Sequence, residues 1–242
     1  NRGKLLKTLI ESGAQTVSDP TQCHAVAIDA RAPKYDGGIV SRLDSVSFGI
    51  VVNKEGLRFY DEGEDFWPKR YAIWGRLVAQ QPDQIAYSIV DSKVKDRFMP
   101  SVFPPIEASS LDELATKLGV NSSSLINTVQ QFNQAVKKGN YDPSKLDGKQ
   151  TLGLSPDKTN WALTLDSPPF LAYPLKPGIT FTYLGLKINE QAQVLNQSNT
   201  PFDNVTAAGE IMAGNILGEG YCAGTGMTIG GVFGRIAGNI SP

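Results

Sequence analysis

Apolar residues recur along the chain with two different spacings, and these spacings predict where helices and strands lie. At the start, Leu5, Leu6, Leu9 and Ile10 fall on one face of a helix. Gly13 follows the last of them, at a position where glycine commonly ends a helix. We therefore expect the chain to open with a short amphipathic helix.

Three further helices are expected in the middle of the chain. One follows Pro68, where aromatic and aliphatic residues recur at helical spacing. A second begins at Ser110, which stands three residues before Glu113 in the capping-box arrangement. A third covers the segment "SSSLINTVQQFNQAVKKG", whose closing lysines and glycine suit the negative end of a helix dipole.

Continuous or alternating apolar runs predict strands between these helices. "FGIVVNKEGLRFYDE" predicts a buried strand, a turn at Lys54–Gly56 and a returning strand at Leu57–Tyr60. "IAYSIVD" predicts another strand, and "PGITFTYLGLKINEQAQVLN" predicts two strands joined near Asn189. Residues 140–169, rich in Pro, Asp and Lys, predict a long loop. The pattern indicates an α+β fold.

Composition restricts the function. With 242 residues, the chain suits one large domain or two small ones. It has 23 basic and 24 acidic residues, a balance that argues against nucleic acid or an anionic membrane surface as main partner. No run approaches the roughly 18 apolar residues of a membrane span. Two cysteines form no disulfide framework, which favours a cytoplasmic location, and the single His24 argues against a histidine-rich metal site.

Glycine is concentrated in "AAGEIMAGNILGEGYCAGTGMTIGGVFGRIAG", residues 207–238. Gly224 and Gly226 begin a G-x-G pattern, but the third glycine of a dinucleotide fingerprint is missing, and too little chain follows for a second strand. What remains is a glycine loop that leads into a helix from about Thr228 to Gly238. Each interior glycine costs a helix about 1 kcal/mol relative to alanine. Such a helix indicates close approach of either a ligand or another chain segment, and the composition leaves both open.

The same residues resemble a known family. "AAGEIMAGN" and "GYCAGTGMTIGGVFGRIAG" resemble the C-terminal flavin-binding segment of the fumarate reductase/succinate dehydrogenase flavoprotein superfamily, which includes 3-ketosteroid dehydrogenases. "TQCHAVAIDARAP", "GGIVSRLDSVSFGIVVNKEGLRFYDEGEDF" and "AGNILGEGYCAGTGMTIGGVFGRIAG" are most similar to its tricarballylate dehydrogenase branch. The resemblance follows the whole chain in order.

The resemblance implies a layout. It suggests an inserted capping domain together with the C-terminal part of a discontinuous, Rossmann-like FAD-binding domain. Residues 1–23 would be a fragment of the FAD-binding domain, residues 24–180 the capping domain that handles substrate, and residues 181–242 the return of the FAD-binding domain. The glycine-rich pyrophosphate loop of the family has no match here, so we expect this chain to be the C-terminal portion of a longer protein, and inactive alone.

The resemblance also implies roles for individual residues. Glu210 matches an acid that binds the flavin ribityl or ribose hydroxyls, and the N–H groups at the helix start match those facing flavin O2 and N1. Tyr221 has a counterpart in ketosteroid dehydrogenases that binds a substrate carbonyl. The expected cofactor-binding residues are Glu210, Gly226, Met227, Thr228 and Ile229. The expected catalytic residues are Tyr221, His24 and Arg42, and the expected substrate-binding residues are His24, Arg31, Arg42, Tyr183 and Tyr221. Arg70 is a further cationic candidate.

Three positions depart from the fumarate reductase pattern. Phe66 stands where those enzymes carry a proton-donating Arg, Tyr221 where they carry a substrate Arg, and Phe181 where they carry a substrate His. Fumarate reduction by the usual proton relay is therefore not expected.

The leading hypothesis is an FAD-dependent oxidoreductase that transfers a hydride between flavin N5 and a substrate bearing a carboxylate or carbonyl, with tricarballylate to cis-aconitate as the named candidate. An electron-transfer protein is its expected partner. Two alternatives stay open: a catalytically silent cap or binding module, and an unrelated α+β structural domain.

Overall fold

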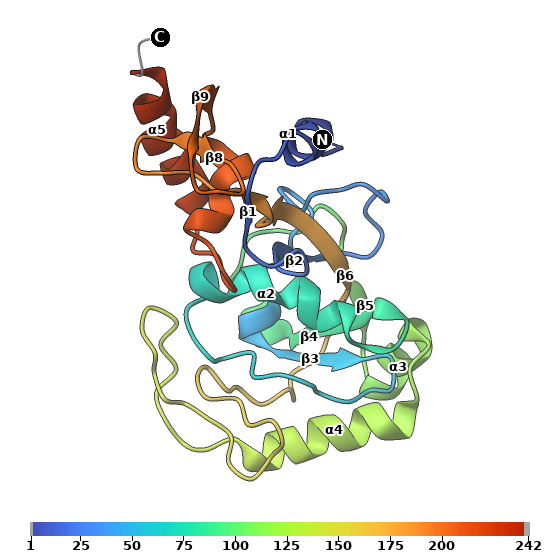
Figure 1. Ribbon diagram of the computed structural model, residues 1–242. Helices are drawn as coiled ribbons and strands as arrows, with labels where there is room; N and C mark the ends of the chain where they lie inside the picture. The colour runs from blue at the N-terminus through green and yellow to red at the C-terminus, as the bar shows by residue number, and fades with distance from the viewer. Residues whose placement is uncertain (1, 240–242) are drawn as a thin grey trace. The chain divides into compact units, whose positions relative to one another are not determined.

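A computed structural model describes residues 2–239 and divides the chain into two compact units (Figure 1). Unit 1 combines the first 24 residues with those from Ile179 onward, and unit 2 contains Ala25–Gly178. The domain boundaries that the resemblance implies, after residues 23 and 180, stay a prediction. The mixture of helices and strands predicted from the sequence is present in both units.

Unit 2 is built on one sheet with the strand order β2-β6-β4-β3, and β5 also pairs with β6. Neighbouring strands β3, β4 and β6 are antiparallel, with Ile50 opposite Ile89 and Ile89 opposite Ala172. The strands are β2 (Cys23–Asp29), β3 (Ile50–Asn53), β4 (Ala86–Asp91), β5 (Ile106–Ala108) and β6 (Phe170–Thr182). The helices are α2 (Trp67–Ala79), α3 (Leu111–Leu118) and α4 (Ser122–Ala135), with short 3₁₀ turns at η1 (Val46–Phe48), η2 (Pro82–Gln84) and η3 (Ser92–Val94).

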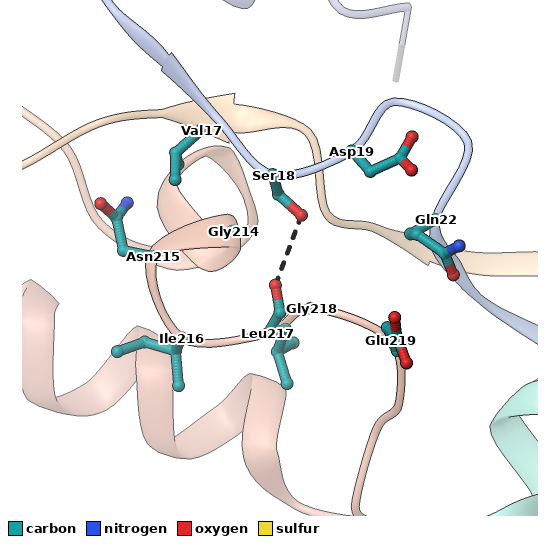
Figure 2. Close-up of a pocket in the computed structure, with 10 residues that line it drawn as sticks. All are labelled: Val17, Ser18, Asp19, Gln22, Gly214, Asn215, Ile216, Leu217, Gly218 and Glu219. Atoms are coloured by element: carbon teal, nitrogen blue, oxygen red, sulfur yellow. Dashed lines mark hydrogen bonds between the residues drawn. The ribbon is translucent and has the colours of Figure 1, made fainter.

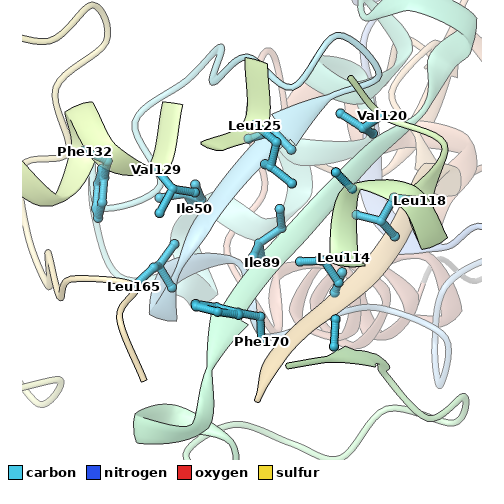
Figure 3. Packing of buried hydrophobic residues seen from close by; sticks show 14 of the residues in the cluster. Ile50, Ile89, Leu114, Leu118, Val120, Leu125, Val129, Phe132, Leu165 and Phe170 are labelled. Atoms are coloured by element: carbon cyan, nitrogen blue, oxygen red, sulfur yellow. The ribbon is translucent and has the colours of Figure 1, made fainter. Parts of the chain in front are cut away.

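Both faces of this sheet are buried, which explains the uninterrupted apolar runs of β3 and β4. On one face Ile50 and Ile89 pack beneath α3 and α4, as Figure 3 shows. On the other face Val51 and Val90 pack with Trp74 of α2. Because successive strand residues point to opposite faces, each of these runs supplies two separate cores.

The helices expected between residues 68 and 135 are present, and α3 shows a modified capping box. The Ser110 hydroxyl accepts the Glu113 N–H at 3.1 Å, as predicted. The Glu113 carboxylate, however, accepts the N–H of Ser109 rather than that of Ser110. Two backbone donors at the helix start are thus satisfied reciprocally.

The returning strand predicted at Leu57–Tyr60 is wrong, because only a single bridge joins Arg58 to Val52. Arg58 instead turns inward and forms a buried ion pair with Glu62, whose carboxylate also accepts the Val51 N–H. The partner strand of β3 is β4. A buried arginine must find a carboxylate, and that requirement outweighs the local hairpin pattern.

The predicted loop at residues 140–169 contains no helix or strand in the structure, and its interior is held by hydrogen bonds. The fully buried Lys158 donates to the carbonyls of Ser47 at 2.8 Å and Gly49 at 2.6 Å. Burial lowers the pKa of Lys158 to about 8. One lysine therefore ties the long loop to the segment that precedes β3.

Unit 1 contains two small antiparallel sheets, β1 with β7 and β8 with β9. The turn predicted near Asn189 is present, where the Asn189 N–H donates to Gln193. The elements are α1 (Lys4–Glu11), β1 (Thr16–Val17), β7 (Gly185–Leu186), β8 (Gln193–Leu195), β9 (Pro201–Thr206), the 3₁₀ helix η4 (Gly209–Asn215) and α5 (Thr225–Gly238). Among residues 2–239, no helix is long and apolar enough to cross a membrane.

Candidate active site

Helix α5 begins directly after the glycine loop, and its first N–H groups are only partly used. Gly224, at φ 93°, adopts the left-handed conformation that glycine accepts readily. The Gly226 N–H donates to the Tyr221 hydroxyl at 2.8 Å, and the Thr228 N–H donates to the Gly224 carbonyl at 3.1 Å. The Met227 N–H has no acceptor among residues 2–239. Of the N–H groups expected to face a cofactor, that of Met227 is the one left available at the positive helix end.

His24 and Tyr221 lie together although they are far apart in the sequence. Their rings stack with centroids 4.1 Å apart and planes 6° from parallel. Phe181 packs against Tyr221 from another direction, with ring centroids 5.7 Å apart. His24 is buried. The ring stack and the bond from Gly226 together fix the position of the Tyr221 hydroxyl.

One side of α5 is open, although the helix is rich in apolar residues. Among its described residues only Ile229 is buried, and Met227 is 85% exposed. At Gly226 an added Cβ would lie 2.7 Å from the Tyr221 hydroxyl. At the other glycines of this region an added Cβ would meet nothing within 4 Å; these are Gly218, Gly220, Gly224, Gly230, Gly231, Gly234 and Gly238. The helix therefore presents a bare backbone surface that a flat ligand can approach closely.

Glu210 lies in η4, and one of its two carboxylate oxygens already accepts hydrogen bonds. Its Oε1 atom accepts the N–H of Thr182 at 2.8 Å and the Thr182 hydroxyl at 2.9 Å. These two bonds hold the carboxylate in place. The second oxygen has no donor among residues 2–239, so it can accept hydroxyl donors, which is the role the resemblance implies for this residue.

Unit 1 also contains a cavity of about 460 Å³ between two chain segments. Figure 2 shows the Ser18 hydroxyl of one segment directed at the Leu217 carbonyl of the other, 3.5 Å away. The side chains of Asp19 and Glu219 lie on the same side of this view. The lining residues are Val17, Ser18, Asp19, Gln22, Gly214, Asn215, Ile216, Leu217, Gly218 and Glu219.

The two chain segments that line the cavity, residues 17–22 and 214–219, each come shortly before one member of the stacked pair. His24 follows the first segment and Tyr221 follows the second. Sequence reasoning missed the polar lining residues Ser18, Asp19, Gln22 and Glu219. A turn-rich "SDPT" directly before the segment that holds His24 was the available signal. Hydrogen bonds from Thr21 hold the pKa of Asp19 below its usual value, so this carboxylate is charged at neutral pH.

Each predicted arginine already has a carboxylate partner within unit 2. Arg42 also stacks its guanidinium over the ring of Tyr71, 5.1 Å from the centroid. An incoming carboxylate would have to compete with these internal pairs. The pairs are Arg31 with Asp29, Arg42 with Asp44, and Arg70 with Glu64. The binding roles of Arg31 and Arg42 remain predictions.

Tyr183 was expected to bind substrate, but the structure places its side chain in the core of unit 1, with no exposed surface. A side chain in this position contacts its neighbours in the described structure, and the substrate-binding role of Tyr183 stays a prediction. Phe66, at the position where fumarate reductases carry an arginine, packs against Trp161 with ring centroids 6.0 Å apart. Aromatic packing thus replaces a cation at this point of unit 2.

Comparison with known proteins identifies the family. Residues 1–229 match the model of the FAD binding domain. The chain belongs to this family. It is 31% identical over 199 residues to the NADH:acrylate oxidoreductase of Vibrio harveyi, covering 78% of this chain and 18% of that protein. It is 30% identical over 196 residues to the NADH:fumarate oxidoreductase of Klebsiella pneumoniae, covering 78% of this chain and 19% of that protein.

Solved structures share the fold of this FAD binding domain protein. The open conformation of a flavocytochrome c3 fumarate reductase matches with a TM-score of 0.67 and 24% identity, covering 98% of this chain and 39% of that one. The 3-ketosteroid Δ1-dehydrogenase of Sterolibacterium denitrificans matches with a TM-score of 0.73 and 21% identity, covering 99% and 46%. The chain spans about a fifth of the length of the two curated relatives described above.

FAD is the cofactor of this family, and the residues of unit 1 fit it. The open glycine surface of α5 accepts a flat ring system, the Met227 N–H offers a donor, and Glu210 offers a carboxylate oxygen. A helix N-terminus stabilises negative charge, which suits a ring that becomes anionic on reduction.

Proposed function

We propose that this chain is part of an FAD-dependent oxidoreductase that acts on a small carboxylate, and that Tyr221 contacts the substrate. FAD, when bound, exchanges a hydride with the substrate carbon at flavin N5. The proposal rests mainly on one observation, the stack of His24 and Tyr221 with the Tyr221 hydroxyl bonded to the first turn of α5.

The direction of the hydrogen bond determines what Tyr221 contributes. Its oxygen accepts the Gly226 N–H, and a phenol hydroxyl is both an acceptor and a donor. A phenol that donates to a substrate carboxylate withdraws charge from it and makes the adjacent C–H bond more acidic. His24 keeps the phenol ring in one orientation through the stack. The pair thus holds a donor in place beside the glycine surface.

We propose tricarballylate as the substrate and cis-aconitate as the product. In this reaction a saturated carbon loses a hydride, its neighbour loses a proton to a base, and a double bond forms between them. The names of the two relatives point to acrylate and fumarate, which are also carboxylates with a reacting carbon–carbon bond. Phe66 and Phe181, in place of the arginine and histidine of fumarate reductases, argue against fumarate itself. An electron-transfer protein would re-oxidise the flavin.

Anaerobic mixing of tricarballylate with the whole FAD-loaded enzyme, of which we propose this chain is a part, tests the proposal. We expect the visible flavin absorbance to bleach. In Tyr221→Phe the rate should fall about tenfold to a hundredfold, since one hydrogen bond to a charged group is lost, while flavin content stays unchanged. His24→Ala should also slow the reaction.

Tyr35→Phe is the control, because Tyr35 is 91% exposed and belongs to unit 2, whereas the stacked pair belongs to unit 1. Its rate should equal that of the wild type. Unchanged rates in both Tyr221→Phe and His24→Ala would refute the site. No bleaching by tricarballylate, and no re-oxidation of the reduced protein by cis-aconitate, would refute the substrate.

A further inference from the structure

Tyr221 lies in a stretch of chain with little regular structure of its own. Residues 216–224 join η4 to α5 without a helix or strand, and Gly220 directly precedes Tyr221. Most residues of this stretch are exposed. Glycine-rich backbone has wide conformational freedom, so the orientation of the Tyr221 ring depends on the groups that contact its side chain.

Three groups of unit 1 contact this side chain. His24 stacks on the ring in parallel, and the Gly226 N–H donates to the hydroxyl at 2.8 Å. Phe181, the last residue but one of β6, packs against the same ring with planes 49° apart. A stacked pair tolerates lateral offsets between its two rings. A tilted third ring restricts those offsets, and Phe181 supplies it.

Phe181 is itself held in place. Its ring centroid lies 6.5 Å from that of Tyr183, which is fully buried in the core of unit 1. An added Cβ at Gly226 would lie 3.2 Å from a ring carbon of Phe181 and 2.7 Å from the Tyr221 hydroxyl. The side chains of Phe181 and Tyr221 thus meet at the same glycine, with no room for a side chain there.

The chemistry of Phe181 limits what it can do at this position. The resemblance places it where fumarate reductases carry a substrate histidine, but a hydrocarbon ring cannot bind a carboxylate through a hydrogen bond. We propose that Phe181 is a positioning residue, which holds the Tyr221 ring on His24 and so sets where the Tyr221 hydroxyl meets the substrate. Tyr183 supports Phe181 from the core. This proposal rests on the proposed function, in which Tyr221 contacts the substrate.

The single histidine of the chain gives a direct measure of the stack. The protons of the His24 ring lie over the face of Tyr221, whose ring current moves their NMR signal, and no second histidine overlaps with it. Spectra of the 242-residue chain require neither FAD nor substrate. Tyr221→Leu removes the aromatic ring and marks the signal position of an unstacked His24.

In Phe181→Leu we expect the His24 signal to move part of the way toward its position in Tyr221→Leu. Phe202→Leu is the matched control, because Phe202 packs in the same core but makes no ring contact with His24 or Tyr221 among residues 2–239. Its His24 signal should stay at the wild-type position. In the wild type, nuclear Overhauser effects between the rings of Phe181 and Tyr221 test the contact without any substitution.

The whole FAD-loaded enzyme gives a second readout. Phe181→Leu should slow the bleaching by tricarballylate about tenfold to a hundredfold at unchanged flavin content, since a misplacement of about 1 Å in a catalytic site costs about a hundredfold. The proposal is overturned by an unmoved His24 signal in Phe181→Leu, by an equal movement in Phe202→Leu, or by absent Overhauser effects. A moved signal with an unchanged rate would support the positioning by Phe181 and contradict the role of Tyr221 in the reaction.

Discussion

Helices α2 and α5 have similar lengths and both are rich in apolar residues, yet they are used in opposite ways. Six of the 13 residues of α2 are buried, whereas one of the 14 described residues of α5 is buried. Helix α2 uses its apolar residues to fill a core, and α5 leaves a glycine surface open. The difference separates apolar sequence that fills a core from apolar sequence that the described residues leave uncovered.

A glycine in each helix makes the comparison concrete. At Gly75 of α2, an added Cβ would lie 2.5 Å from the Val26 carbonyl oxygen. At Gly234 of α5, an added Cβ would meet nothing within 4 Å. The first glycine is required by packing within unit 2, whereas packing among residues 2–239 does not require the second.

The largest effect is expected at the buried ion pair of unit 2. Glu62→Ala leaves Arg58 buried without its carboxylate, which should lower the free energy of unfolding by about 3 to 5 kcal/mol. Denaturant unfolding measures this loss. Glu11→Ala, which breaks the exposed pair with Lys7, is the control and should cost under about 1 kcal/mol. Equal losses in the two variants would show that the Arg58–Glu62 pair is not part of the packed core.

A somewhat smaller effect is expected from the titration of Lys158. Its pKa is lowered to about 8 in the folded chain, below its ordinary value of 10.5. Between pH 8 and pH 10.5 the unfolded chain keeps the Lys158 proton and the folded chain loses it. The free energy of unfolding should therefore rise with pH, by about 1.4 kcal/mol for each pH unit in this range. The free energy of unfolding of the wild type is compared with that of Lys158→Met from pH 7.5 to 10.5. The rise should be smaller in the variant, and identical pH profiles would contradict the assignment.

The smallest effects come from the two glycines and have opposite signs. Gly75→Ala should destabilise the chain by about 1 to 3 kcal/mol through overpacking against the backbone. Gly234→Ala should stabilise it by about 0.5 to 1 kcal/mol, because alanine is the better helix former. Thermal unfolding of both variants measures the difference. Destabilisation by Gly234→Ala would mean that α5 is packed after all.

The sequence predicts the elements whose signals are local. The helices α1, α3 and α5 and the strand β4 follow from periodicity and capping residues that act within a few positions. The returning strand at Leu57–Tyr60 fails because Arg58 pairs with Glu62 in the interior, a tertiary demand with no local signature. The candidate site shows the same difference between what the sequence indicates and what only the tertiary structure determines. Family resemblance pointed to both His24 and Tyr221, but their stacking depends on how the chain brings distant segments together.

The cavity walls of unit 1 were not predicted, nor was a small pocket of unit 2 that is lined by Phe66, Trp67 and Trp161 among others. Both are assembled from separate loop segments, and loops carry weak periodic signals. Trp161 shows the difficulty, because its left-handed backbone is imposed by its surroundings and is unusual for its residue type.

The most direct test of the central claim is a titration of the 242-residue chain with FAD, followed by amide chemical shifts. The open surface of α5 predicts shifts concentrated at Met227 and the first turn of the helix. Gly230→Val should abolish them by filling the open surface, and Gly238→Val, at the far end of α5, should leave them intact. Shifts that avoid the start of α5, or that persist in Gly230→Val, would contradict the account.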